Sequence, residues 1–465
     1  MISELVNKVG EEVEIAGWVA GRRDHGKLIF LDFRDASGVV QAVALPNHAE
    51  SSSVAATLRS EWVVSVKGKV NPRPEKMINL EIATGKIELE ILELTVLNQA
   101  ETPPFDLASD GREIGEETRL KYRYLDLRRE RLQKNVRARA QMIKFIRAYL
   151  DSRSFTEIET PILTKSTPEG ARDYIVPARL YPGTFYALPQ SPQQYKQLLM
   201  VGGMERYYQI ARCFRDEDTR GDRQPEFTQL DLEMSFVKEE DIISLIERML
   251  IELVKTHYPE KKIQQIPFPH LSYKEAIAKY NSDRPDLRED KDDPNLLAFC
   301  WVVDFPFFEK TDSGAWTFTH NPFSAPKPEH REWLMEKKNI GEILTAQYDI
   351  VLNGLEVGGG SIRNHEPAAL RKVFEIMGFA ADRIESNFGH MLKALASGAP
   401  PHGGIAPGLD RLIMILQNEP NIREVIAFPK TGEGRDPMMD APSPVTSEQL
   451  KELHIKTDQD AKPSK

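Results

Sequence analysis

Residues 206–236 read RYYQIARCFRDEDTRGDRQPEFTQLDLEMSF and predict two β-strands joined by a long polar loop. Strand alternation gives the second strand one apolar face, made of Leu230, Leu232, Met234 and Phe236. The opposite face is polar apart from one aromatic ring, and consists of Phe227, Gln229, Asp231 and Glu233. On the first strand, Arg215 shares a face with Gln209, Ala211 and Cys213. We therefore expect an antiparallel pair with one core face and one charged face.

The charged face suits a nucleotide. Arg215 could meet a phosphate, Phe227 could stack on a base, and Glu217 could accept a hydrogen bond from an exocyclic amine. A solvated face of an antiparallel sheet would give the same pattern. The common phosphate-binding motifs GxxxxGK[ST] and GxGxxG are missing, so a nucleotide would be held in another way.

Three segments resemble the signature motifs of the class II aminoacyl-tRNA synthetases. The string FRDE followed by RQPEF resembles motif 2, FTEIETP at 155–161 resembles motif 1, and GGIAPGLDRLIMIL at 403–416 resembles motif 3. The three occur in the order that the family has. This resemblance implies a catalytic domain built on an antiparallel sheet flanked by helices, and a homodimer that forms through motif 1.

Within that class, nearly the whole chain is similar to bacterial-type aspartyl-tRNA synthetases. Long literal matches carry the similarity: STPEGARDY (166–174), SPQQYKQLLM (191–200), HNPFSAP (320–326) and NGLEVGGGSIR (353–363). The resemblance implies ATP-dependent activation of L-aspartate as an adenylate, followed by transfer to the 3′-terminal adenosine of tRNA(Asp).

The first hundred residues predict a small β-barrel. Five short apolar runs alternate with turn residues: VEIAGWVA, KLIFLDFRD, VVQAVAL, EWVVSVKGKV and IELEILELTVL. A five-stranded OB-fold fits best, and its second and third strands present a nucleic-acid-binding face. We assign Arg23, Phe30 and Gln41 to these strands and expect them to contact the anticodon, although Phe30 could equally be a core aromatic.

The remaining chain predicts an α+β domain behind a hinge. We expect an OB-fold domain at 1–100, a hinge rich in turn formers and acids at 101–135, a catalytic domain at 136–455, and a disordered polar tail at 456–465. Helical spacing begins with Val136, Ala140 and Ile143.

The family resemblance assigns an aspartate pocket. Lys196 and Arg363 would bind the β-carboxylate, and His320 would close the pocket. The groups expected near the α-ammonium are Ser191, Gln193, Asp231 and, on a closing loop, Glu169.

The resemblance also assigns the ATP site. Arg215 and Arg411 are the catalytic arginines, for the α- and γ-phosphates, and Gly403 with Gly404 would let nucleotide approach the backbone. The remaining expected ATP-binding residues are Asp216, Glu217, Gln224, Phe227, Glu356, Gly408, Leu409 and Asp410. Asp349 and Glu356 would hold Mg²⁺, which requires a β-bulge near Gly354 because strict alternation separates them.

Charge and composition limit the other possibilities. The formal net charge is −10, yet residues 119–147 are crowded with Arg and Lys, which suits either a phosphate backbone or a solvated helix. Cys213 and Cys300 lie far apart without metal-site companions, so we expect buried thiols. No apolar run approaches membrane-spanning length and no secretory signal begins the chain, which favours the cytoplasm.

The sequence also departs from the bacterial pattern. The large domain usually inserted between motifs 2 and 3 is missing, because YNSDRPDLREDKDDPNLLAFCWVVDFP runs through its position. Asn321 stands where the family often has a second histidine. His25 and the HNPFS string resemble enzymes that also charge tRNA(Asn), which makes this tRNA a second hypothetical partner.

Two alternatives stay open. A sister synthetase for asparagine or lysine shares the plan of barrel and catalytic domain, although neither side chain calls for paired Lys196 and Arg363. A catalytically inactive RNA-binding paralogue would keep only the fold, against which the intact charged residues argue.

Overall fold

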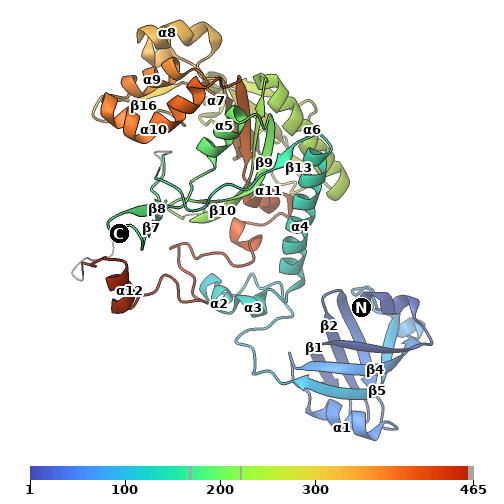
Figure 1. Cartoon of the computed structure of the whole chain (residues 1–465). Coiled ribbons are helices and arrows are strands. Elements are labelled where there is room, and N and C mark those ends of the chain that lie inside the picture. Colours follow the sequence, from blue (N-terminus) through green and yellow to red (C-terminus); the bar gives the residue numbers. More distant parts are fainter. Residues whose placement is uncertain (167–169, 220–221, 459–465) are drawn as a thin grey trace. The chain divides into compact units, whose positions relative to one another are not determined.

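The computed structural model describes residues 1–166, 170–219 and 222–458. The chain divides into two compact units (Figure 1). The first comprises Met1–Gly115 and Tyr124–Arg129, and the second comprises Glu116–Arg123 and Glu130–Lys465. Each is described by itself below. In the described part of the chain, no helix is long and apolar enough to cross a bilayer.

The first unit is a closed barrel with strand order β1-β2-β3-β5-β4, as predicted. Its strands are β1 (Glu12–Asp24), β2 (Ile29–Asp35), β3 (Gly38–Ala44), β4 (Val63–Pro72) and β5 (Ile87–Asn98). The short helices are η1 (Ile2–Asn7), α1 (Ala49–Thr57) and η2 (Glu75–Met77), together with α3 (Arg123–Asp126) from Tyr124 onward, since Arg123 belongs to the second unit. Alternating residues such as Val19, Leu31 and Phe33 fill the interior and are fully buried.

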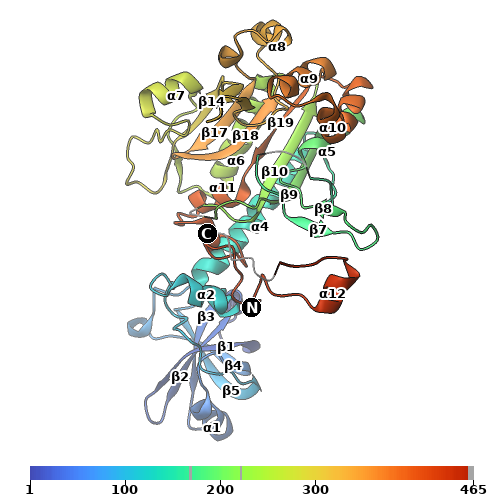
Figure 2. The same cartoon turned by 90° about the vertical axis from the view of Figure 1, so that its left-hand side faces the viewer.

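The second unit is built on an eight-stranded, mostly antiparallel sheet, with order β12-β14-β17-β18-β19-β10-β9-β6 (Figure 2). Only the pairs β12–β14 and β6–β9 are parallel. The strands are β6 (Thr156–Glu157), β9 (Arg206–Phe214), β10 (Glu226–Ser235), β12 (His270–Ser272), β14 (Phe299–Val303), β17 (Gln347–Leu352), β18 (Leu355–Ile362) and β19 (His402–Pro407). This arrangement confirms the α+β prediction.

Helices α4 (Glu130–Asp151), α6 (Glu239–His257) and α11 (Leu409–Leu416) pack on the sheet in one apolar core. The other helices are α2 (Glu116–Lys121), α5 (Gln193–Val201), α7 (Tyr273–Tyr280), α8 (Arg331–Glu336), α9 (Pro367–Ile376), α10 (Ala381–Ala396) and α12 (Ser447–Glu452), with 3-10 turns η3 (Pro328–His330), η4 (Ile340–Glu342) and η5 (Ile422–Glu424). Short strand pairs are β7 (Ile175–Pro177) with β8 (Phe185–Ala187), β11 (Lys262–Ile263) with β13 (Leu296–Leu297), and β15 (Phe308–Lys310) with β16 (Trp316–Phe318).

Strand β10 lies inside the sheet, between β9 and β19, and this position changes its predicted faces. Leu230, Leu232 and Met234 join the core as expected. Asp231 and Glu233 are fully buried, so the charged face is covered and not solvated. The prediction for Phe236 was wrong, because the strand ends at Ser235 and Phe236 is 69% exposed, with a positive φ of 59°.

Several arginines of the basic stretch 119–147 are engaged within the fold. Arg119 donates from both terminal nitrogens to Glu424, at 3.0 and 2.7 Å. Arg123 donates to the carbonyls of residues 423, 426 and 427. Arg139 pairs with Asp410 at the start of α11. These arginines tie α2 and α4 to the segment that contains motif 3.

The two remaining sequence expectations are met. Helix α7 ends at Tyr280 and β13 begins at Leu296, so only a short loop connects them where a domain insertion was expected to be missing. Cys213 and Cys300 are both buried free thiols. Of the tail predicted to be disordered, 459–465 lies outside the described residues.

Prediction on the Arg119–Glu424 pair. Burial raises the pKa of Glu424, but Arg119 and Arg131 outweigh it and lower the pKa from 4.5 to about 2. A lowered folded-state pKa stabilises the protein above the unfolded value, and this contribution disappears as the pH falls from about 4.5 to about 2. We expect Glu424→Gln to cost up to about 3 kcal/mol at pH 7 and much less near pH 3. Urea unfolding at both pH values measures this, and an equal loss at both would contradict it.

Candidate active site

A cleft of about 440 Å³ opens beside the centre of the eight-stranded sheet. Strands β10, β17, β18 and β19, helix α5, the start of α11 and the loop between β9 and β10 contribute its walls. Fifteen of the predicted residues line it: Ser191, Gln193, Lys196, Arg215, Glu217, Gln224, Phe227, Asp231, His320, Asp349, Glu356, Arg363, Gly408, Asp410 and Arg411. The structure thus gathers residues that span more than two hundred positions of sequence.

Two of the predicted side-chain contacts, Leu409 and Asp216, do not line this cleft. The side chain of Leu409 is fully buried in the main core, because it faces the sheet from the first turn of α11. Asp216 is directed to Arg172, which it meets at 3.4 Å, and is half-exposed. Glu169 lies outside the described residues.

The floor of the cleft is a buried network of two cations and two carboxylates. Arg363 donates to both oxygens of Glu233, at 2.8 and 3.0 Å. Lys196 Nζ donates to Asp231 Oδ2 at 2.9 Å and lies 3.5 Å from Glu233 Oε2. All four side chains are at most 3% exposed. The two cations come from α5 and from just beyond β18, and they converge on neighbouring side chains of β10.

The two carboxylates of this floor differ in what they can still bind. Burial raises the pKa of Asp231 against the pull of Lys196, and its Oδ1 has no hydrogen-bond donor among the described residues. Burial also raises the pKa of Glu233, but Arg363 and Lys196 outweigh it and leave that pKa below its ordinary value. Glu233 is therefore an anion fixed in place, whereas Asp231 keeps one buried acceptor for a cationic ligand group.

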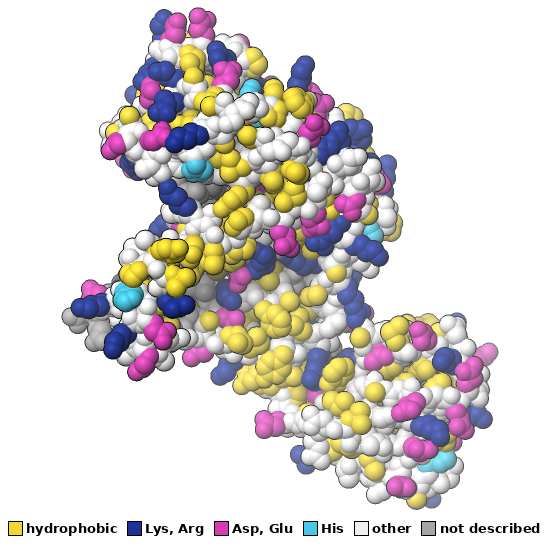
Figure 3. Space-filling model, in the orientation of Figure 1, with side chains coloured by type: hydrophobic (Ala, Val, Ile, Leu, Met, Phe, Trp, Pro, Cys, Tyr) yellow, Lys and Arg dark blue, Asp and Glu magenta, His cyan; other side chains and the backbone are white. Residues whose placement is uncertain are grey.

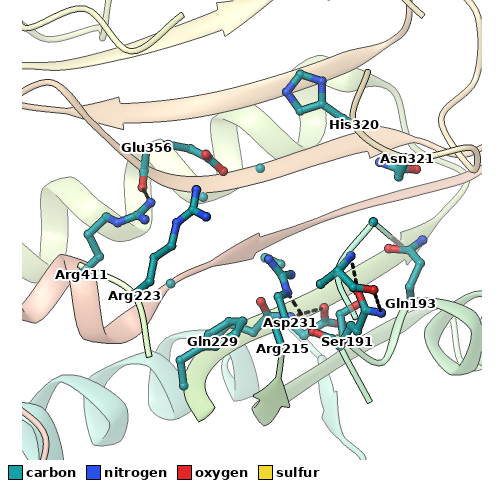
Figure 4. A pocket seen from close by; sticks show the side chains of 18 of the residues that line it. Ser191, Gln193, Arg215, Arg223, Gln229, Asp231, His320, Asn321, Glu356 and Arg411 are labelled. Atoms are coloured by element: carbon teal, nitrogen blue, oxygen red, sulfur yellow. Dashed lines mark hydrogen bonds between the residues drawn. The ribbon is translucent and has the colours of Figure 1, made fainter. Parts of the chain in front are cut away.

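The opposite end of the cleft is rich in arginine (Figure 4). Figure 4 shows Arg223, Arg411 and Glu356 together there, while Ser191, Gln193 and Asn321 lie toward the other end. Arg215 stacks over the ring of Phe227 at 5.0 Å from its centroid. Arg411 pairs with Asp222 at 2.7 Å and donates to the carbonyl of Glu356. Arg223 lies 3.4 Å from Glu217.

Asp349 and Glu356 point toward the same spot, as the predicted bulge requires. Ile350 pairs with Gly358 but Val351 pairs with Glu356, so β18 contains one extra residue, Val357. A Cβ on Gly359 would lie 2.9 Å from Asp349 Oδ1 and 3.3 Å from Glu356 Oε1. Burial and the neighbouring Glu356 raise the pKa of Asp349 well above its ordinary value. Two hard oxygen ligands thus converge over a glycine.

His320 borders this carboxylate pair, with its Nε2 4.0 Å from Asp349 Oδ2. Burial lowers the pKa of His320, so the ring is neutral at pH 7 despite the nearby acids. Its ring packs edge-on against Phe305, at 4.8 Å between centroids. Next to it, the side-chain oxygen of Asn321, Oδ1, accepts a hydrogen bond from the backbone amide of Phe323 at 3.0 Å, which fixes the local turn.

The prediction for Gly403 and Gly404 was wrong. A Cβ on Gly404 would lie 2.0 Å from the Leu232 carbonyl oxygen and 2.2 Å from Glu233 Oε2. A Cβ on Gly403 would lie 2.5 Å from the side chain of Ile362. Both glycines therefore make room for neighbouring strands and for the Glu233 carboxylate, not for a nucleotide.

Asp410 has a structural task that the sequence did not reveal. One of its oxygens pairs with Arg139 of α4, and the other accepts from the Thr228 amide of β10 at 2.8 Å. It thus joins the helix next to motif 1, the second strand of motif 2 and the motif 3 helix. A direct contact of Asp410 with ATP stays a prediction.

Sequence reasoning also missed several other residues of the cleft. They share polar side chains and positions near the predicted ones: Gln190, Asp218, Thr219, Asp222, Arg223, Gln229 and Gln347. Glu233 was placed on the polar face of its strand but given no role. The signal for Glu233 was its spacing, because it is two residues from Asp231 on the same strand face.

In the barrel, the three predicted anticodon residues lie together. Arg23 pairs in register with Phe30, and its guanidinium donates to Asp32 at 2.6 and 3.0 Å and to Gln41 Oε1 at 3.2 Å. The strand assignment of Arg23 was wrong: it belongs to β1, which reaches further than the first apolar run indicated. His25 packs edge-on against Phe30, at 5.6 Å between centroids.

Comparisons with known proteins agree with this architecture. A family model described as tRNA synthetases class II (D, K and N) matches residues 115–432, and one for the OB-fold nucleic acid binding domain matches 13–97. The chain is 43% identical to an aspartate–tRNA(Asp/Asn) ligase of Rubrobacter xylanophilus, with 97% of this chain and 95% of the relative covered. It is 40% identical to an aspartate–tRNA ligase of Macrococcus caseolyticus, with 96% of each covered.

The alignment to the Rubrobacter relative extends over 574 positions, more than the 465 residues of this chain. Part of that relative therefore has no counterpart in this chain, in agreement with a missing insertion. Among solved structures, the asparaginyl-tRNA synthetase of Pyrococcus horikoshii has a TM-score of 0.73 at 23% identity, covering 91% of this chain and 96% of that one. The aspartyl-tRNA synthetase of Entamoeba histolytica has a TM-score of 0.72 at 23% identity, covering 92% and 90%. These structures share the fold.

Prediction on Asp349. A folded-state pKa above the unfolded value means that the ionised carboxylate destabilises the protein, and that this cost fades as the pH falls below the folded pKa toward the unfolded one. We expect Asp349→Asn to raise the unfolding temperature at pH 7 in buffer without divalent cations, with a smaller gain near pH 4. Calorimetry measures this, with Asp312→Asn on an exposed turn as the control. A lower unfolding temperature for Asp349→Asn at pH 7 would refute the like-charge account.

Proposed function

The chain belongs to the aspartate–tRNA ligases of the class II tRNA synthetases, and on that premise we propose which of its residues bind aspartate, ATP, Mg²⁺ and tRNA. The reaction activates L-aspartate with ATP to give aspartyl-adenylate and diphosphate. The aspartyl group then passes to the 3′-terminal adenosine of tRNA(Asp).

The observation that carries the substrate assignment is the convergence of Lys196 and Arg363 in the floor of the cleft. Glu233 fixes the guanidinium through two hydrogen bonds, which leaves a planar donor edge oriented before substrate arrives. A β-carboxylate is the ligand that two adjacent buried cations select. The α-ammonium would be received at the other side by Asp231 Oδ1, with Ser191 and Gln193 nearby.

The alternatives are less well supported. A neutral carboxamide would offer the donors of Lys196 and Arg363 a weaker, uncharged acceptor than a carboxylate, and a lysine ammonium would meet positive charge. The aspartate relatives at 40–43% identity likewise do not favour a sister synthetase. An inactive paralogue would have no reason to keep buried charges as costly as these.

Activation follows from the two ends of the cleft. The α-carboxylate oxygen of aspartate attacks the α-phosphorus of ATP, the bond to the β-phosphate oxygen breaks, and diphosphate leaves. Arg215 would lie between carboxylate and α-phosphate, with Phe227 under the adenine. Arg411 would exchange its partner Asp222 for the γ-phosphate. In the second step the ribose hydroxyl attacks the adenylate carbonyl and AMP leaves, with positioning as the main contribution.

Asp349 and Glu356 fit a magnesium site. Their oxygens converge over Gly359, and burial together with the neighbouring Glu356 carboxylate raises the pKa of Asp349. When bound, Mg²⁺ would neutralise phosphate charge and orient the ATP chain. The described residues contain no group of three or more metal-ligating side chains, so the remaining ligands would be phosphate oxygens and water.

The barrel supports tRNA binding through Arg23, Phe30 and Gln41. Its exposed surface combines an aromatic ring with charged and amide groups, as base stacking and edge recognition require. Two of the relatives are described as ligases for both tRNA(Asp) and tRNA(Asn). We extend this dual use to the present chain, with the cytoplasm as its expected place of action.

The proposal also includes a homodimer. Large apolar side chains are exposed on the β7–β8 hairpin and just after motif 1: Ile162, Leu163, Tyr174, Ile175, Leu180, Tyr181, Phe185 and Tyr186. Figure 3 shows hydrophobic side chains gathered over this hairpin. Ile162 and Leu163 directly follow motif 1, which contains β6, the terminal strand of the sheet. A second copy of the chain would cover this apolar surface.

Prediction on substrate. The protein should catalyse exchange of diphosphate into ATP with aspartate and Mg²⁺, but not with asparagine or lysine. Arg363→Ala should reduce the exchange by at least about a hundredfold, because a charge-assisted bidentate contact is lost. Arg363→Gln combined with Glu233→Gln leaves no unpaired buried charge and should lose exchange while remaining folded. Arg383→Ala on exposed α10 is the control.

Exchange with asparagine alone would assign the pocket to a sister synthetase. Absence of exchange with any amino acid would support the inactive paralogue. In the second half-reaction, tRNA(Asp) and tRNA(Asn) are offered separately. Charging of tRNA(Asp) alone would remove the dual specificity and leave the aspartate assignment intact.

Prediction on assembly. Replacing Leu180 and Tyr181 by Glu should convert a dimer into a monomer at micromolar concentration, because two charges enter an apolar interface. Sedimentation velocity measures this. Leu80→Glu is the matched control, since Leu80 is 88% exposed on the other unit. An unchanged sedimentation coefficient of the double variant would place the interface elsewhere.

A further inference from the structure

The segment 428–441, here called the brace, follows motif 3 and has an internal structure of its own. Thr431 and Arg435 form a hydrogen-bonded turn in which Gly434 has φ +76°. Asp436 and Ala441 exchange two backbone hydrogen bonds, at 2.7 and 3.0 Å. The Asp436 carboxylate is buried and accepts from the amides of Met438 and Met439. The brace is therefore a folded loop and not a loose extension.

The brace is hydrogen-bonded to the motif 2 loop, residues 215–225. The Gln224 side chain donates from Nε2 to the Lys430 carbonyl at 3.1 Å and accepts from the Lys430 amide at 2.7 Å. The Thr219 hydroxyl donates to the carbonyl of Gly432. Lys430 Nζ lies 3.2 Å from Asp436 and 3.5 Å from Glu226, at the start of β10. These contacts hold both the outgoing and the returning part of the loop.

Gln224 and Thr219 are 5% and 8% exposed, although both border the cleft. The side-chain amide of Gln224 both donates to and accepts from the Lys430 backbone, in the same way that two paired strands exchange hydrogen bonds. The neighbours Glu217, Asp222 and Arg223 instead form ion pairs at the cleft, Glu217 with Arg223 and Asp222 with Arg411.

We propose that the brace positions the motif 2 loop for ATP, with Gln224 and Thr219 as positioning residues that act through the loop. The proposal rests on the proposed function, because it concerns the nucleotide end of the same cleft. Any conformational freedom that a binding loop loses when ATP binds weakens the affinity. Hydrogen bonds to a folded segment remove that freedom in advance, so that Arg215 and Arg223 meet the phosphates without reordering.

The experiment compares ATP and aspartate dependence of diphosphate exchange in three variants of the full-length protein. Thr219→Val removes the hydroxyl donor at constant volume, and Thr219→Ser keeps it. Asp436→Ala loosens the brace from within, at a residue that does not line the cleft. We expect Thr219→Val and Asp436→Ala to raise the KM for ATP by roughly three- to tenfold, with little change in the KM for aspartate. Thr219→Ser should have a lower KM for ATP than Thr219→Val.

A second measurement separates positioning from direct contact. Hydrogen exchange at the Lys430 amide, and at the Arg215 amide that donates to the Pro225 carbonyl at 2.9 Å, should accelerate in Asp436→Ala. The double variant Thr219→Val with Asp436→Ala should raise the KM for ATP by less than the product of the single effects, because both act through the loop. An ATP KM of Asp436→Ala equal to that of the wild type, with unchanged loop exchange, overturns the proposal. A wild-type protein without aspartate-dependent exchange would instead refute the proposed function.

Discussion

The buried network of Lys196, Arg363, Asp231 and Glu233 is the interaction on which the rest of the site depends. Four charges at most 3% exposed are costly to desolvate, and they persist only where each has a close partner of opposite sign. That requirement explains why β10 lies inside the sheet, with β9 and β19 on either side. It also explains Gly404, since a side chain there would occupy the space of the Glu233 carboxylate. The motif 3 glycine thus serves an amino-acid site on the neighbouring strand.

The three signature motifs are joined by polar contacts as well as by the common core. Asp410 of motif 3 holds Arg139 of α4 and the Thr228 amide of motif 2. Arg119 and Glu424 repeat this connection further along the chain. Several arginines of 119–147 therefore have a structural role. Counting charges in the sequence could not distinguish this role from a nucleic-acid-binding surface. Their partners, Glu424 and Asp410, are distant in sequence, and only the fold brings them together.

Local periodicity predicted the strands and the two faces of β10, because both follow from backbone geometry over a few residues. The bulge between Asp349 and Glu356 contradicts strict alternation, and was expected only because the resemblance assigned both residues to Mg²⁺. Local periodicity failed where neighbours in space decide. Phe236 lost its core position because β10 stops one residue earlier, and Arg23 joined β1 because that strand extends past its apolar run. The burial of Asp231 and Glu233 depends on the neighbouring strands β9 and β19. The alternation of residues along one strand does not show how many strands lie beside it. The partners of Gln224 are residues that no motif marks.

The two sides of the motif 2 loop have opposite requirements. Toward the cleft, Glu217 and Asp222 neutralise Arg223 and Arg411 while no phosphate is bound, so excess positive charge does not destabilise the protein. These carboxylate partners must be exchangeable. Partly exposed ion pairs such as these, of which Arg223–Glu217 is 3.4 Å long, contribute little to stability. Toward the brace, the buried side chains of Gln224 and Thr219 are bound to backbone atoms, whose positions do not depend on charge. The loop can therefore exchange carboxylate partners for phosphates on one side, while its hydrogen bonds on the other side keep its position unchanged.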